Sequence, residues 1–137
     1  MASESDLQWR DEYSVGLFEI DRQHQQIIKL FNDLSMLCAI DNNKSYDTFK
    51  MMLLSAAEYL QNHFWTEEMR MKKSNYPGFL EHKQRHVEML QKINQMASNI
   101  GTDDSLTIKS VTEYLKGWYK EHLLSLDKEM GEYFIKN

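Results

Sequence analysis

The sequence predicts an all-α protein, an up-down-up-down four-helix bundle preceded by an N-terminal arm. Apolar residues recur at steps of three and four along the chain, which is the spacing of a helix face that packs against a core. Turn-forming residues divide the 137-residue chain into four long stretches, and the single proline lies in one of these turns. Stretches of roughly 20 to 30 residues form helices about 30 Å long or more, and short connections make neighbouring helices antiparallel.

One domain is expected over residues 1–137, with an arm at residues 1–20 and the bundle at residues 21–137. Residues that break helices set the expected boundaries. The first three helices should end at residues 41–43, 76–78 and 99–104, and the fourth should run from about Ser105 to the C-terminus. In the arm, Trp9 and Phe18 are expected to pack on the bundle.

Composition excludes several classes of partner. The chain has 16 basic and 21 acidic residues, for a net charge of −5, and the basic residues form no cluster. Nucleic acid and anionic membranes are therefore poor partners. The N-terminus lacks an apolar targeting segment, and no apolar run approaches the ~18 residues of a membrane span, so a soluble cytoplasmic protein is expected. The lone Cys38 cannot form an internal disulfide and is expected to pack in the core.

Histidine occupies the apolar face of every predicted helix. In the second helix the apolar face continues into an imidazole and a carboxylate, in the order Phe49, Leu53, Ala56, Leu60, His63 and Glu67. All five histidines of the chain lie on such faces, namely His24, His63, His82, His86 and His122. A single histidine on an apolar face is more often a hydrogen-bonded core residue than a metal ligand. The placement of all five histidines on apolar faces favours a shared ligand site.

The spacing of these residues suits metal binding. His82 and His86 are four residues apart, so both rings project from one helical face and can reach one ion. His63 and Glu67 repeat this spacing with a carboxylate. A buried carboxylate needs a cation, because an unpaired buried charge is costly. The neighbouring Glu68 should lie on another face and be dispensable for metal binding.

Asp127 is the second candidate acid, although an isolated acid of this kind is more often a solvated surface residue. It follows His122 by five residues, which places it about 140° around a regular helix. Asp127 must therefore reach a different point of the core or lie where the helix is locally widened. Imidazole and carboxylate ligands suit iron, zinc or manganese, and the absence of thiolates argues against a structural zinc site. Two bridging carboxylates, with the histidines divided three and two, would leave one metal an open position.

Four segments together resemble the hemerythrin family, specifically its stand-alone bacterial members. They are YSVGLFEIDRQH (13–24), HFWTEEM (63–69), YPGFLEHKQRH (76–86) and GWYKEHLLSLD (117–127). The resemblance implies a non-haem di-iron centre, with two iron ions joined by an oxo or hydroxo bridge. It also implies reversible O2 binding at a five-coordinate iron, which serves oxygen transport, storage or delivery rather than an enzymatic reaction.

The resemblance also assigns the residues. His82, His86 and His122 would hold the saturated iron, His24 and His63 the open one, Glu67 and Asp127 would bridge them, and Trp118, Tyr119 and Leu123 would line the O2 pocket. Tyr119 departs from the family, in which leucine is usual at this position. Its ring could turn outward and place the hydroxyl in solvent, or it could point inward and donate a hydrogen bond to an oxygen ligand.

Two other functions stay open. A ferritin-like di-iron enzyme would need E-x-x-H pairs, and no glutamate in this chain has a histidine three residues later. An oxidase or peroxidase activity at a hemerythrin-type site, influenced by Tyr119, is nevertheless an alternative. The other is a sensor of O2, nitric oxide or redox state. Such modules usually carry an output domain, for which this chain has no residues left, so a sensor would act on a separate protein partner.

Overall fold

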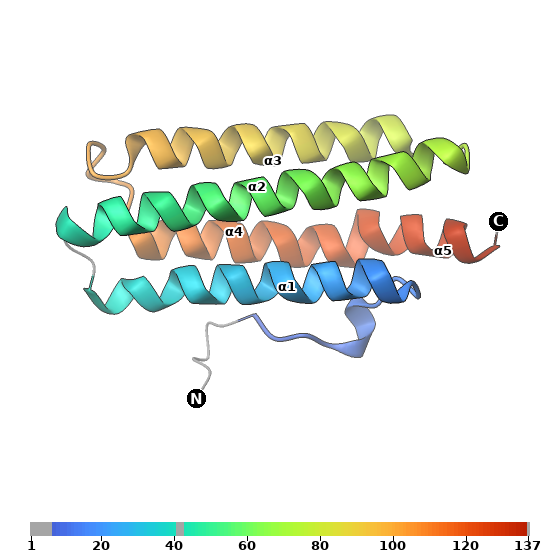
Figure 1. Cartoon of the computed structure of the whole chain (residues 1–137), viewed down its shortest axis with the longest axis horizontal. Coiled ribbons are helices and arrows are strands. Elements are labelled where there is room, and N and C mark those ends of the chain that lie inside the picture. The colour runs from blue at the N-terminus through green and yellow to red at the C-terminus, as the bar shows by residue number, and fades with distance from the viewer. Residues whose placement is uncertain (1–6, 41–42, 137) are drawn as a thin grey trace.

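The computed structural model describes residues 7–40 and 43–136, and within these residues every regular element is helical. The α-helices are α1 (Phe18–Ser35), α2 (Asn43–Lys73), α3 (Phe79–Asn99), α4 (Ile108–His122) and α5 (Lys128–Lys136). They lie side by side along one long axis, and α4 and α5 lie end to end as the fourth helix of the bundle (Figure 1). Helix α2 packs against α1 and α3, and α1 also packs against α4. The predicted four-helix bundle is confirmed.

Helix boundaries differ from the predicted ones where local hydrogen bonds decide them. Helix α4 begins at Ile108 rather than near Ser105, because Thr107 forms a capping box with Ser110. The Thr107 hydroxyl accepts from the Ser110 amide at 3.0 Å, and the Ser110 hydroxyl accepts from the Thr107 amide at 2.9 Å. Helix α1 continues into a 3-10 turn, Met36–Ile40, ahead of the predicted break, of which residues 41–42 lie outside the described residues.

The core confirms the predicted apolar faces in three helices and corrects the fourth. The face of α2 is buried along its whole predicted length, and Phe49, Leu53 and Leu60 are 0% exposed. In α4 the steps of three and four from Leu115 through Trp118 to His122 predict a buried Trp118, but Trp118 is half-buried and Tyr119 is 0% exposed. Steps of three and four both follow a helical face. The pattern alone therefore could not choose between two adjacent aromatic residues.

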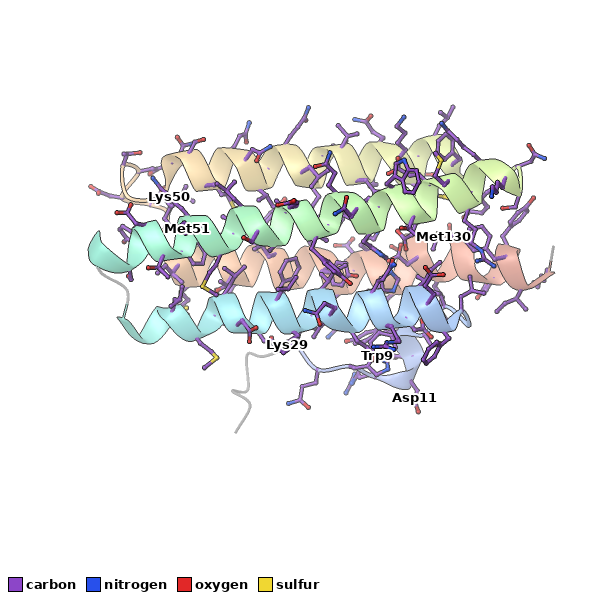
Figure 2. All side chains as sticks on the ribbon, viewed as in Figure 1. Trp9, Asp11, Lys29, Lys50, Met51 and Met130 are labelled. Carbon is purple, nitrogen blue, oxygen red and sulfur yellow. The ribbon has the colours of Figure 1, made fainter. Side chains whose placement is uncertain are left out.

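The N-terminal arm packs along α1 (Figure 1). The Leu7 amide donates to the Asn32 side-chain oxygen at 3.0 Å, and the Asn32 side-chain nitrogen donates back to the Leu7 carbonyl at 2.7 Å. Trp9 lies where the arm meets the bundle, whereas Asp11 points away from it (Figure 2). The expectation for Phe18 is wrong, because its ring is 78% exposed at the start of α1. Arg22 lies over that ring, 5.7 Å from its centre.

The arm also contacts the C-terminal end of the bundle. The Lys128 ammonium donates to the backbone carbonyls of Glu12 and Ser14, at 2.9 and 3.1 Å. Gly131 faces Val15 so closely that a Cβ atom at position 131 would collide with the Val15 carbonyl. These contacts fix the arm beside the first turns of α5.

Cys38 is half-buried and packs against the core, with its Sγ 3.9 Å from the Thr112 hydroxyl oxygen. Across residues 7–40 and 43–136, no helix combines the length and apolar character that crossing a membrane requires.

Candidate metal centre

Each of the four helical segments of the bundle, whose arrangement Figure 1 shows, contributes side chains to one buried cluster of imidazoles and carboxylates. The cluster consists of His24 from α1, His63 and Glu67 from α2, His82 and His86 from α3, His122 from α4 and Asp127 from the turn that follows α4. None of these side chains is more than 5% exposed. All seven predicted metal ligands therefore lie together inside the bundle.

Glu67 lies between two sets of histidines. Its Oε2 atom is 3.0 Å from Nε2 of His24 and 3.3 Å from Nε2 of His63. Its Oε1 atom faces the other way, 3.4 Å from Nε2 of His86 and 4.0 Å from Nε2 of His82. One carboxylate thus presents a different oxygen to each set.

Asp127 repeats this arrangement from the fourth helical segment, between α4 and α5. Its Oδ1 atom is 2.9 Å from Nε2 of His82 and 3.1 Å from Nε2 of His122, while Oδ2 is 3.3 Å from Nε2 of His24. Within each of two groups the potential ligand atoms lie within 4.8 Å of one another, and these groups are His82, His86, His122 and Asp127, and His24, His63 and Glu67. The first is called here the three-histidine half and the second the two-histidine half.

A π-helical turn, Leu123–Asp127, brings Asp127 to the site. In a regular α-helix a residue five positions after His122 would point about 140° away. The π turn accommodates one more residue per turn, which returns Asp127 to the face of His122. The local widening considered from the sequence is therefore confirmed.

The unpaired atoms of the cluster test whether a metal fits. Among the described side chains, several buried polar atoms of the cluster have no hydrogen-bond partner, including Nε2 of His63, His86 and His122, Oε1 of Glu67 and Oδ2 of Asp127. Leaving such a group unpaired costs about 1–3 kcal/mol. Neutral imidazole nitrogens and carboxylate oxygens are ligands that iron and manganese accept. The donor set therefore fits a pair of such metals.

Without a metal, the charges of the cluster stabilise one another. Burial alone would lower the pKa of His86, but the carboxylates of Glu67 and Glu68 outweigh it and raise that pKa to about 9. Burial alone would raise the pKa of Glu67, but His63 and His24 hold it well below its usual range. Metal ions and protons thus compete for the same buried atoms.

Comparison with known proteins identifies the family. A family model described as the Hemerythrin HHE cation binding domain matches residues 15–134. The chain belongs to the hemerythrin family. All the predicted ligands lie in the four segments on which the sequence resemblance rested, and that resemblance is confirmed.

Relatives in bacteria and animals support this assignment. A bacteriohemerythrin of Clostridium acetobutylicum is 26% identical over 123 residues, which cover 88% of this chain and 95% of that protein. The myohemerythrin of Sipunculus nudus is 27% identical over 119 residues, 87% of this chain and 86% of that protein. A bacteriohemerythrin of Stenotrophomonas maltophilia is 24% identical over 128 residues, 92% of this chain and 80% of that protein.

Two polar residues behind the predicted ligands were missed from the sequence. Nδ1 of His63 donates to the Gln23 side-chain oxygen at 2.6 Å, and Nδ1 of His86 donates to Oε2 of Glu68 at 2.8 Å. Each bond fixes the proton on Nδ1 and leaves Nε2 free for a metal. Glu68 points to α3 rather than beside Glu67, but it contacts a predicted ligand there, and its dispensability for metal binding stays a prediction. Both contacts join different helices, so no spacing within one helix signals them.

Aromatic rings cover the three-histidine half. Phe64 stacks on His86, with ring centres 3.7 Å apart and planes 5° apart. Trp118 stacks on His122 at 4.5 Å and 13°, and its outer side lines a surface hollow. Leu123 is fully buried in the core. The assignment of Trp118 and Leu123 to an O2 pocket stays a prediction.

Tyr119 points into the bundle, so the outward orientation considered from the sequence is wrong. The residue is 0% exposed, and its ring meets those of His24 and Phe31 edge-on at 6.0 and 5.6 Å. Burial raises the pKa of the phenol well above its usual value, and the charges of Asp127 and Glu67 add to this. The hydroxyl therefore keeps its proton and can act as a hydrogen-bond donor.

Proposed function

We propose that this chain binds O2 reversibly at a non-haem di-iron centre and acts as an oxygen carrier or store. The observation that supports this most directly is the placement of the two carboxylates, each of which directs one oxygen to each half of the site. Two such groups can bridge a pair of metals. The unequal division of the histidines leaves one ligand fewer at the two-histidine half. That half is where an external ligand would bind.

The protein contributes charge, orientation and exclusion of water. Glu67 and Asp127 supply two negative charges that offset the charge of a metal pair. Gln23 and Glu68 hold the ligating rings of His63 and His86 in the tautomer that presents Nε2. The iron pair, when bound, supplies the electrons that reversible O2 binding requires. Burial of the whole cluster keeps bulk water from the open position.

The test is metal analysis combined with visible absorption. The purified chain is loaded with ferrous iron without oxygen, exposed to O2 and then depleted of O2. We expect two iron ions per chain, one for each half of the site, and an absorption band that appears with O2 and disappears when O2 is removed. A colourless protein with a single zinc ion would contradict the proposal.

A second candidate is oxidase or peroxidase activity, and the inward orientation of Tyr119 favours it. The protonated phenol beside the two-histidine half can stabilise reduced oxygen species by donating a hydrogen bond to them. Stopped-flow mixing of the ferrous protein with O2 distinguishes the two functions. A carrier gives a long-lived adduct, whereas an enzyme consumes O2 or added reductant repeatedly.

A further inference from the structure

One buried group in the interior is not explained by the set of predicted ligands. Among the described side chains, buried polar atoms that lack a hydrogen-bond partner belong to the seven predicted ligands and to one other residue, Tyr119. Metal ions would satisfy the unpaired Nε2 and carboxylate atoms, whereas Nδ1 of His24 and Nδ1 of His82 are unpaired as well but belong to the ligand rings. The Tyr119 hydroxyl stays unpaired, although a buried hydroxyl normally has a partner. A partner is therefore expected to come from outside the chain.

The position of the ring indicates where that partner binds. The Tyr119 ring lies edge-on to His24, at 6.0 Å between ring centres, and His24 belongs to the two-histidine half. On the other side the ring meets Phe31 at 5.6 Å, which fixes its orientation. The adjacent half has one histidine fewer than its counterpart. The Tyr119 ring, which carries the unpaired hydroxyl, and the position with the missing ligand therefore lie on the same side of the site.

We propose that the Tyr119 hydroxyl donates a hydrogen bond to the external ligand of the two-histidine half, and so selects small ligands whose acceptor atom carries negative charge. This inference rests on the proposed di-iron function and specifies the ligand chemistry of the same site. Hydrogen bonds to charged acceptors are stronger than those to neutral ones. A phenol in this position therefore favours anions, such as azide, over neutral molecules of similar size.

The decisive variant is Tyr119→Phe, which keeps the ring and removes only the hydroxyl. Azide is titrated into the iron-loaded ferric protein, and binding is followed by visible absorption. A lost hydrogen bond to a charged ligand predicts azide binding about tenfold weaker or more in the variant. If the hydroxyl only fills space, its removal leaves binding unchanged or makes it tighter, and either result overturns the inference.

The matched control is Tyr114→Phe, which makes the same chemical change on an exposed part of α4. Its ring also lies under the ammonium of Lys92, a contact that phenylalanine retains. We expect azide binding by Tyr114→Phe to equal that of the parent. An equal loss in both variants would mean that the effect does not come from the site, and would also overturn the inference.

A second measurement needs no metal. In the metal-free protein the Tyr119 hydroxyl has no partner, so Tyr119→Phe should unfold at the same denaturant concentration as the parent or at a higher one. A midpoint clearly below that of the parent would mean that the hydroxyl is bonded within the protein, which overturns the inference. Failure of the parent itself to take up two irons or to bind azide would overturn the proposed function as well. Intact parent behaviour with unchanged azide binding in Tyr119→Phe overturns this inference alone.

Discussion

The two halves of the metal site differ in what holds their histidines from behind. In the three-histidine half, His86 donates to the carboxylate of Glu68 at 2.8 Å, and Phe64 stacks on the same imidazole. In the two-histidine half, His63 donates instead to the neutral amide oxygen of Gln23 at 2.6 Å. One half therefore has a charged acceptor and a stacked aromatic ring, and the other has a neutral acceptor and the Tyr119 ring edge-on to His24.

This difference indicates separate tasks for the two halves. A carboxylate behind an imidazole makes that ring a stronger electron donor than an amide does. Strong electron donation by an imidazole and a full set of ligands would suit a metal that keeps its ligands permanently. Weaker donation and a missing ligand leave a metal more acidic towards an external ligand. The second layer of residues thus reinforces the asymmetry that the three-to-two division of the histidines creates.

Removal of both metals takes away the ions that the two halves hold and should have the largest effect. A ligand at 1,000 times its dissociation constant stabilises the folded state by about 4 kcal/mol. Treatment of the iron-loaded protein with a chelator should therefore lower its thermal midpoint by about 10 °C or more. Circular dichroism during heating measures this, and the same chelator added to the metal-free parent, which has no metal to lose, is the control. Equal midpoints with and without metal would contradict the prediction.

Glu67→Ala should have the next largest effect, because it removes a carboxylate that faces both halves. Iron content should fall to about one ion per chain or less, since one charge and one bridging group are lost. Metal analysis after reconstitution measures this. Glu58→Ala, an exposed change on the same helix, should retain full loading. Full iron content in Glu67→Ala would exclude a bridging role.

Glu68→Ala acts on the three-histidine half alone. Loss of the acceptor behind His86 should weaken metal binding at that half by about 10- to 100-fold, the usual effect of removing such an outer hydrogen bond. Competition with a chelator of known affinity measures this. The control is Glu113→Ala on the exposed side of α4. Binding unchanged from the parent would restore the original expectation that Glu68 is dispensable.

Gln23→Glu makes the two halves alike and should have the smallest effect of these changes. A carboxylate behind His63 would increase its donation and stabilise the ferric state. The reduction potential should shift negative by some tens of millivolts, as a nearby charge of about 1 kcal/mol implies. Gln26→Glu adds the same charge at an exposed position of α1 and should shift the potential less. Equal shifts in the two variants would mean that only net charge matters.

The sequence predicted the parts of the site that periodicity within one helix determines. The face of α2 that extends from Phe49 to Glu67 is buried as expected, because burial follows the helical repeat. Gln23 and Glu68 were missed because their hydrogen bonds cross between helices. Tyr119 could not be oriented, because its neighbour Trp118 fits the same repeat. Packing against the other helices decides which of Trp118 and Tyr119 is buried. The spacing of residues within one helix carries no information about that packing.

The π turn at Leu123–Asp127 has the geometry of a one-residue insertion confined to a single turn. If the same residues continued as a regular α-helix, every later position of this segment would be rotated by about 100° relative to α4. Asp127 would leave the histidines, and Gly131 would no longer meet Val15 of the arm. The same added residue therefore sets the register of a metal ligand and of the N-terminal arm. Deletion of the exposed Ser125 would regularise the helix and leave Asp127 four residues after His122, so both contacts should survive that deletion.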